Sequence, residues 1–285
     1  MKIYLLPVHS ATKPNHQASI YPSHNNDYGV EQDFFDYLKC HPNLLVNNPH
    51  DADWHYLSIY WTRWHVNHNY GKEGLGELQA YVDSALLSPK KTFTVCQYDD
   101  GPVTNLYGAK EFLASRKTKG GIDIPLISKP HTIPWLAPRK KHRATFVGRL
   151  STHPLRTAMA NHLLGNGKYV IMDGDIGTRK YVLLMLQSYV ALCPRGYGGS
   201  SFRFYEAMQL GLVPFLIGDR DTRPFKDQLP WAEFSLYTNN PTKIESIISQ
   251  YSEQELLKMG QIAKKVWNEA LTYQKWCNLA LKELE

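Results

Sequence analysis

The feature that most constrains this chain is an alternation between strand-like and helix-like segments that runs along its whole length. Strand-like segments, short and rich in apolar or β-branched residues, lie at 2–8, 54–60, 91–97, 122–126, 145–147, 169–172, 189–192 and 212–217. Segments with apolar residues at helical spacing lie at 30–38, 75–86, 155–164, 180–186, 201–210 and from 244 to the end. This alternation is typical of parallel α/β layers and argues against a sandwich or a helical bundle. A length of 285 residues suits two such domains, each with its own core.

Domain boundaries are predicted from composition. We expect an N-terminal domain over 1–133, a linker over 134–143, a second domain over 144–265 and a C-terminal helix over 266–285 that returns to the first domain. Three prolines lie in the stretch from Pro130 to Arg143, and a basic cluster fills 139–143. Prolines and charges together favour a solvated linker.

Composition narrows the class of protein. No run approaches the roughly eighteen apolar residues of a membrane span, and Pro7 interrupts the short apolar N-terminus. The four cysteines are far apart without a CxxC pair, which argues against a disulfide framework and a structural zinc site. A soluble protein of the reducing cytoplasm is expected. A net charge of +6 suits anionic ligands, but no nucleic-acid recognition motif accompanies it.

The segment 192–219 carries the most chemistry, because a strand, a glycine-rich turn, a helix and another strand follow one another. Its glycines let backbone amides approach a ligand, and Ser200 and Ser201 stand at a helix start whose dipole favours a diphosphate. Arg203 adds a bidentate donor, and Glu206 lies on the same helix face. The pattern predicts a nucleotide site. The competing interpretation is a tight turn followed by an Arg203–Glu206 ion pair.

This segment resembles the C-terminal signature of the exostosin family, glycosyltransferase family 47. The matching residues are Cys193-Pro194, Gly196, Ser201, Arg203, Glu206-Ala207, Gly211 and Pro214, continued by Pro224-Phe225 and the run from Trp231 to Ser235. Earlier segments are similar too, in the family's order: Tyr28 with Glu31, Asn48–Asp53, Asp123–Pro125, and Phe146–Arg149 with Arg156. The family's Asp-His-Phe segment, expected before Lys91, is missing.

The resemblance implies a GT-B fold, in which two Rossmann-like domains with parallel sheets face each other across a cleft. It implies an inverting, metal-independent glycosyltransferase that uses a UDP-sugar and a glycan or glycoprotein acceptor, with no other cofactor. Glu206 would hold the ribose hydroxyls. The other predicted donor-binding residues are Gly148, Arg149, Arg156, Arg195, Tyr197, Ser200, Ser201 and Arg203. Xylose is the favoured sugar, with glucuronic acid, N-acetylglucosamine and galactose as alternatives, and an anchorless version suits a microbe or large virus.

Three residues are candidates for the general base. Asp99 and Asp100 follow a predicted strand, at the edge of a parallel sheet where ligands bind. The segment from Gln97 through Gly101 resembles a family turn, which favours Asp99, although Asp-Asp-Gly-Pro is also a good loop sequence. His9 follows the first strand and is the competitor.

Other motifs support rival interpretations. Asp173-Gly174-Asp175 is a DxD pattern that suggests a metal-dependent glycosyltransferase, although Asp-Gly is ordinary turn chemistry. His65 and His68 have no third metal ligand at a convincing spacing, so a partly exposed loop pair is expected. Trp54 is expected to pack, while Trp61 and Trp64 are open between packing and sugar stacking. A non-catalytic nucleotide- or glycan-binding protein is the alternative function.

Overall fold

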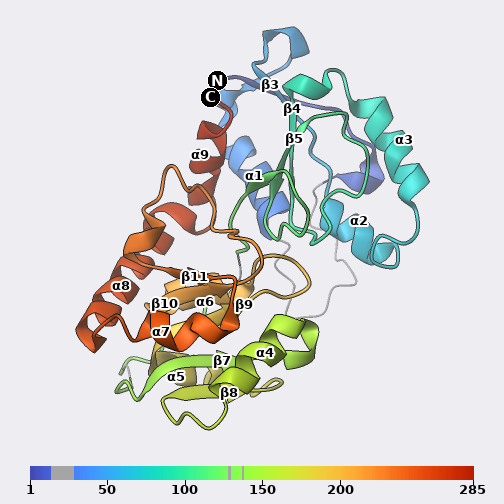
Figure 1. Cartoon of the computed structure of the whole chain (residues 1–285). Helices are drawn as coiled ribbons and strands as arrows, with labels where there is room; N and C mark the ends of the chain where they lie inside the picture. The colour runs from blue at the N-terminus through green and yellow to red at the C-terminus, as the bar shows by residue number, and fades with distance from the viewer. Residues whose placement is uncertain (14–28, 128–129, 137) are drawn as a thin grey trace. The chain divides into compact units, whose positions relative to one another are not determined.

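The computed structural model describes residues 1–13, 29–127, 130–136 and 138–285, and it consists of two compact units (Figure 1). Unit 1 comprises Met1–Ile127 and Tyr273–Glu285, and unit 2 comprises Ser128–Thr272. The first division therefore falls before the expected boundary at 133 and the expected linker over 134–143. The return to unit 1 begins at Tyr273, later than the expected 266.

Unit 1 contains a parallel sheet with strand order β2-β1-β3-β4-β5-β6. Its strands are β1 (Ile3–Leu5), β2 (Leu45–Val46), β3 (Trp54–Tyr56), β4 (Thr92–Cys96), β5 (Lys110–Leu113) and β6 (Ile122–Asp123). The strand predictions at 2–8, 54–60, 91–97 and 122–126 are confirmed in position, although the observed strands are shorter. The short strands β2 and β5 were not expected.

The helices of unit 1 are α1 (Gly29–Cys40), α2 (Trp61–Asn67), α3 (Leu75–Ala85) and α9 (Lys275–Lys282). Helical spacing correctly predicted α1 and α3. The loop interpretation of His65 and His68 is wrong, because His65 lies fully buried inside α2 and His68 ends that helix. Trp61 and Trp64 on the same helix are also buried, so packing within α2 accounts for both.

Unit 2 contains a second parallel sheet, with strand order β11-β10-β9-β7-β8. Its strands are β7 (His142–Val147), β8 (Tyr169–Met172), β9 (Ser188–Pro194), β10 (Val213–Ile217) and β11 (Leu236–Thr238). Its helices are α4 (Pro154–Leu163), α5 (Thr178–Leu186), α6 (Phe202–Leu210), α7 (Ile244–Ile248) and α8 (Glu253–Val266), followed by a π-helical turn over Trp267–Leu271. The sequence predicted each of these strands except β11.

The basic cluster at 139–143 is not a purely solvated linker, so that part of the prediction is wrong. His142 and Arg143 belong to β7. The Arg143 guanidinium donates to the carbonyls of Ile248 and Tyr251 at 2.9 and 2.7 Å, and Lys140 donates to the Ser188 carbonyl at 2.6 Å. These basic side chains anchor the first strand of unit 2 to its neighbours.

The strand order of unit 2 places its helices on both faces of the sheet. The chain runs from β7 to β8 in one direction and then reverses to β9, and right-handed crossovers therefore put α4 on one face and α5 and α6 on the other. The core agrees, since Met159 and Leu163 of α4 pack with Phe146 of β7 and with residues of α7 and α8. Within the described residues, no helix is long and apolar enough to cross a membrane.

Each sheet has one point at which neighbouring strands send their connections in opposite directions. In unit 2 this point lies between β7 and β9, and in unit 1 it lies between β1 and β3. Ligands of open α/β sheets bind outside the carboxyl ends of the strands at such a switch point. The expected class of two parallel α/β domains is therefore confirmed, and the position of each switch point directs the search for a site.

Candidate functional site

The switch point of unit 2 is bordered by two loops, Gly148–His153 after β7 and Arg195–Ser201 after β9. Gly148 has a φ of 148°, and a β-carbon there would lie 2.5 Å from Nη2 of Arg203. Arg203, in the first turn of α6, donates Nη2 to the carbonyl of Val147 and lies 4.4 Å over the ring of Phe146. Glycine at 148 is therefore the residue that lets the α6 arginine reach the end of β7.

Two of the arginines that were predicted to bind the sugar donor, Arg156 and Arg195, direct their N–H groups at carbonyls of these loops. Arg156, on α4, donates to the carbonyls of Arg195, Arg149 and Pro194 at 3.0, 2.9 and 3.5 Å. Burial, and then the nearby charge of Arg203, lower the pKa of Arg156 to about 10. Arg156 thus ties the loop after β7 to the loop after β9, and its direct contact with a donor stays a prediction. The side chain of Arg149 is exposed.

Arg195 holds the glycine turn in the same way. Its Nε and Nη2 donate to the carbonyls of Gly198 and Tyr197, both at 3.2 Å, and its Nη1 pairs with Asp219. From the loop after β10, the Thr222 hydroxyl donates to the carbonyl of Gly199 at 3.1 Å. Hydrogen bonds from Arg195 and Thr222 thereby fix three consecutive carbonyls of the turn, those of residues 197–199.

The part of the glycine turn that leads into α6 consists of Ser200 and Ser201. Ser200 and Ser201 are buried, and Ser201 is the N-cap residue of α6. Tyr197 is 64% exposed and supplies an aromatic face at the edge of the turn. A helix start beside fixed glycines is a good site for a diphosphate.

Glu206 does not pair with Arg203 as the competing interpretation expected; its two oxygens face other groups. The Tyr181 hydroxyl of α5 donates to Oε2 at 2.6 Å, and Nε2 of His131 lies 3.1 Å from Oε1. Burial alone would raise the pKa of Glu206, but His131, then Tyr181 and Arg203, outweigh burial and lower the pKa below its usual value. Glu206 is therefore a carboxylate at neutral pH, one helical turn from Arg203.

Both acids of the DxD pattern have local structural partners. Asp173 accepts the backbone N–H of Leu150 at 2.8 Å, which joins the end of β8 to the loop after β7. Asp175 accepts the N–H of Gly177 at 2.7 Å in a turn. Across the described ranges, no group of three or more potential ligand side chains is arranged to hold a metal ion. These contacts favour the turn interpretation of the motif.

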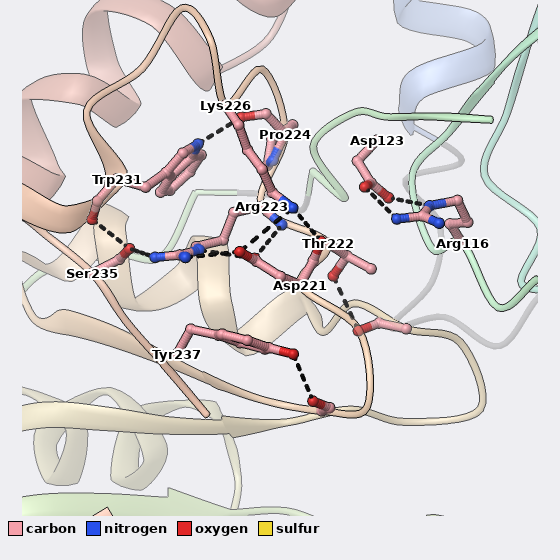
Figure 2. A network of polar contacts seen from close by, with 12 residues as sticks. Arg116, Asp123, Asp221, Thr222, Arg223, Pro224, Lys226, Trp231, Ser235 and Tyr237 are labelled. Atoms are coloured by element: carbon pink, nitrogen blue, oxygen red, sulfur yellow. Dashed lines mark hydrogen bonds and ion pairs between the residues drawn. The ribbon is translucent and has the colours of Figure 1, made fainter. Parts of the chain in front are cut away.

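The loop after β10 is fixed by a polar network (Figure 2). Arg223 donates to both oxygens of Asp221 at 2.8 Å and to the Ser235 hydroxyl at 3.0 Å. The Trp231 indole donates to the carbonyl of Pro224 at 2.6 Å. Pro224 and the run from Trp231 to Ser235, which resemble the family, therefore support the loop that holds Gly199 through Thr222.

The three candidate bases lie in unit 1. Asp99 and Asp100 follow β4, which lies inside the sheet. Asp100 pairs with Lys117 at 2.6 Å. His9 follows β1 at the switch point, where its ring stacks on Tyr81 at 4.1 Å and its Nδ1 accepts the N–H of Ala11. The structure thus places all three at the carboxyl edge of one sheet.

A buried acid, Glu31, supports the loop that follows β4. Glu31 of α1 is fully buried and accepts the backbone N–H and the hydroxyl of Thr62 and the backbone N–H of Gln97, at 3.1, 2.6 and 2.8 Å. Burial raises the pKa of Glu31 to about 8, although these donors oppose the shift. Because Gln97 directly follows β4, Glu31 fixes the start of the loop that carries Asp99. Tyr28, its partner in the family pattern, lies outside the described residues.

Another family-like element of unit 1 has a structural role. Asp123, which opens the Asp123-Ile124-Pro125 segment, is bound through both oxygens by Arg116 at 2.8 and 2.7 Å (Figure 2). This pair fixes the turn between β5 and β6.

Comparison with known proteins decides the family. The sequence profile of the Exostosin GT47 domain matches residues 102–250, just over half of the chain. The chain belongs to the exostosin GT47 family. The family match includes Gly148, Arg203 and Glu206, whereas the candidate bases Asp99, Asp100 and His9 precede it.

Curated proteins agree with the family. A probable glycosyltransferase of Arabidopsis thaliana is 29% identical over 131 residues, which cover 41% of this chain and 25% of that protein. Exostosin-1 of Drosophila melanogaster is 26% identical over 153 residues, covering 45% and 20%. A probable glucuronosyltransferase of Oryza sativa subsp. japonica is 21% identical over 234 residues, covering 73% and 54%. The match thus spans about a quarter of the length of the first of these relatives.

Among solved structures, TarM matches this exostosin-family chain with a TM-score of 0.42 and 12% identity, over 75% of this chain and 60% of that one. The two parallel sheets of the chain establish its fold by themselves.

Sequence reasoning missed two residues of the site, His131 and Tyr181. His131 lies in the stretch expected to belong to the first domain, and Tyr181 lies on a helix with no recognised motif. Both meet Glu206 only because the sheet order brings α5 and the start of unit 2 against α6. The signal that the sequence offered was the hydroxyl of Tyr181, a polar group within the apolar pattern of the predicted helix at 180–186.

Proposed function

We propose that this chain is a glycosyltransferase that moves a sugar from a UDP-sugar to a glycan hydroxyl by single displacement with inversion. The acceptor oxygen attacks the anomeric carbon, the bond from that carbon to the phosphate oxygen breaks, and UDP leaves with the electron pair. The hydroxyl proton passes to a base. The observation that carries the proposal is the placement of Arg203 and Glu206 one turn apart on α6 at the switch point of unit 2.

The charges of the site suit a diphosphate leaving group. Arg203, the buried Ser200 and Ser201, and the amides at the start of α6 would stabilise the charge that develops on the phosphate. We extend the proposal to metal-independent transfer, supported by the engagement of Asp173 and Asp175 in loop hydrogen bonds.

The identity of the donor sugar is also part of the proposal. Xylose is our first candidate because the family resemblance favours it, and glucuronic acid is the second because several rice relatives are named probable glucuronosyltransferases. N-acetylglucosamine and galactose complete the set. The base is proposed to be Asp99, with Asp100 and His9 as alternatives, and a cytoplasmic location is proposed from the composition.

The test of activity is release of UDP from these four UDP-sugars, with glycan acceptors and with or without EDTA. We expect release with at least one donor, at a rate that EDTA leaves nearly unchanged. UDP binding without turnover would instead indicate a non-catalytic binding protein. A strict Mn²⁺ requirement, together with loss of the metal-dependent activity in Asp173→Ala, would overturn metal independence.

The test of the site is UDP affinity measured by calorimetry. Arg203→Ala and Glu206→Ala should each weaken UDP binding by roughly ten- to a hundredfold, because each removes a charge-assisted contact. Lys258→Ala removes an exposed charge on α8 and serves as the control. Folded variants with unchanged UDP affinity would place the donor elsewhere.

A further inference from the structure

Glu206 lies at the centre of a polar cluster whose members come from three separate segments. Tyr181 comes from α5, Glu206 from α6, and His131 from the stretch that opens unit 2. The backbone N–H of His131 donates to Oε1 of Gln209, one turn after Glu206, at 3.3 Å. The imidazole of His131 lies 5.6 Å from the ring of Tyr181. Backbone and ring contacts together hold His131 against α6.

Two buried nitrogens of this cluster have no hydrogen-bond partner among the described residues. They are Nε2 of His131 and Nε of Arg203. His131 Nε2 lies 3.1 Å from Glu206 Oε1, close enough for charge pairing, yet it makes no aligned hydrogen bond. The Arg203 charge acts on both Glu206 and Tyr181. Because His131 Nε2 faces the Glu206 carboxylate, Nε of Arg203 is the buried donor of this cluster that is left for a polar ligand among the described residues.

The acceptor capacity of Glu206 fits that ligand. A carboxylate offers about four acceptor positions. Tyr181 uses one position on Oε2, at 2.6 Å, and His131 faces Oε1. Burial first, and then Glu206, hold the pKa of Tyr181 well above its usual value, so its hydroxyl stays protonated and donates. The carboxylate is therefore locked in orientation, and one acceptor position on each oxygen has no partner among the described residues, which suits two neighbouring hydroxyls.

We propose that His131 and Tyr181 are positioning residues that orient Glu206 toward the vicinal hydroxyls of a ribose. The cluster then makes the site selective for ribonucleotides over 2′-deoxyribonucleotides. The inference rests on the proposed function, because it assigns the ribose of the UDP donor to this cluster. It adds the selectivity of the site and the two residues responsible.

The experiment measures the affinity of the full chain for UDP, 2′-deoxy-UDP and inorganic pyrophosphate by calorimetry. The protein should bind UDP about tenfold more tightly than 2′-deoxy-UDP, the effect of one hydrogen bond to a charged group. Tyr181→Phe and His131→Ala should weaken UDP binding about three- to thirtyfold and bring the ratio between the two nucleotides close to one. Pyrophosphate affinity should stay unchanged, because pyrophosphate has no ribose.

Matched controls come from similar contacts elsewhere in unit 2. Tyr189 donates to Glu253 at 2.7 Å, and His162 lies 3.6 Å from Glu245. Tyr189→Phe and His162→Ala should leave all three affinities unchanged. His131→Gln retains a side-chain N–H donor and should recover part of the UDP selectivity.

The outcomes separate the inference from the proposed function. If the unaltered protein binds neither UDP nor pyrophosphate, the proposed function fails. If it binds UDP and 2′-deoxy-UDP equally, or if folded Tyr181→Phe and His131→Ala keep the full selectivity, the proposed function stands and the ribose inference is overturned. Equal weakening for all three ligands would reduce both residues to a merely structural role and would also overturn it.

Discussion

At the scale of single residues, the side chains of the candidate site differ in how many of their polar groups the protein itself already uses. Arg203 and Glu206 keep donors or acceptor positions for a ligand, whereas Arg156 and Arg195 direct their N–H groups at loop carbonyls. Among the candidate bases, Asp100 is paired with Lys117, and His9 stacks on Tyr81. These contacts divide the predicted site into residues with groups left for a ligand and residues that shape the loops.

The base is tested by substitution. Asp99→Asn should lower turnover by about 10²–10⁴-fold and leave UDP affinity nearly intact, because a general base acts on the acceptor and not on the donor. Asp100→Asn and His9→Ala are the comparison variants, assayed for steady-state rate and UDP affinity. Full turnover in Asp99→Asn together with loss of turnover in His9→Ala would move the base to the switch point between β1 and β3.

Glu31 makes the stability of the fold depend on pH. Its pKa is about 8 in the folded chain and close to the ordinary glutamate value of 4.5 in the unfolded chain, so the folded state binds an additional proton between those values. Unfolding releases that proton, and the free energy of unfolding should therefore fall as pH rises through this window, by at most about 1.4 kcal/mol per pH unit. Urea denaturation of the protein and of Glu31→Gln from pH 5 to pH 8 tests this. Parallel pH curves for the two proteins would contradict it.

At the scale of elements, the backbone of α8 at Gly260 packs directly against the backbone of Gly211 at the end of α6. A β-carbon on Gly260 of α8 would overlap the carbonyl oxygen of Gly211, which caps α6 in a left-handed conformation at a φ of 75°. No flexible side chain can move aside there. The close approach keeps α8 against the helix that carries Arg203 and Glu206.

Gly260→Ala should therefore destabilise the protein by about 1–3 kcal/mol, despite the better helix propensity of alanine, because the added methyl group overpacks a backbone contact. Gly76→Ala in α3 is the matched control, since a β-carbon at that position would meet no atom within 4 Å among the described residues. It should be neutral or stabilising by about 0.5–1 kcal/mol. Equal thermal midpoints for the two variants would show that α8 shifts without cost.

At the scale of the whole molecule, the chain passes from unit 1 to unit 2 and returns for its last helix. The return is secured within unit 1 by Asp33 of α1, whose Oδ2 accepts the Gln274 N–H at 2.7 Å and the Trp276 indole N–H at 2.8 Å. Trp276 is fully buried against Phe34, and Tyr37 donates to Asn278 at 2.7 Å. The C-terminal helix α9 is thus part of the core of unit 1.

Asp33→Ala should loosen unit 1 selectively, because it leaves the buried indole N–H of Trp276 and the partly buried N–H of Gln274 without their acceptor, at a cost of about 1–3 kcal/mol. Hydrogen exchange should accelerate over α1 and α9, while the UDP affinity of unit 2 should change little. Asp36→Ala, which removes a partly exposed carboxylate from the same helix, is the control. Unchanged exchange over α9 in Asp33→Ala would show that apolar packing alone retains the helix.

The sequence by itself determined the class of fold, the main helices and strands, and the family. Periodicity indicates which residues are buried, and so α1, α3, β4, β8 and α6 were predictable from local pattern. Short elements such as β5 and β11 were not, because three or four residues carry too little pattern to separate a strand from a loop. The strand–glycine–helix segment at 192–219 likewise indicated a nucleotide site before any contact was known.

Only the tertiary structure decided the strand order, the switch points and the partners of each polar group. Glu206 meets Tyr181 and His131, which lie 25 and 75 positions earlier in the chain, because the sheet of unit 2 reverses direction after β8. Arg156 looked like a phosphate ligand, yet it reaches the carbonyls of two loops. Burial is encoded residue by residue along a strand or helix, whereas hydrogen-bond partners depend on which distant segments the topology brings within about 3 Å of each other.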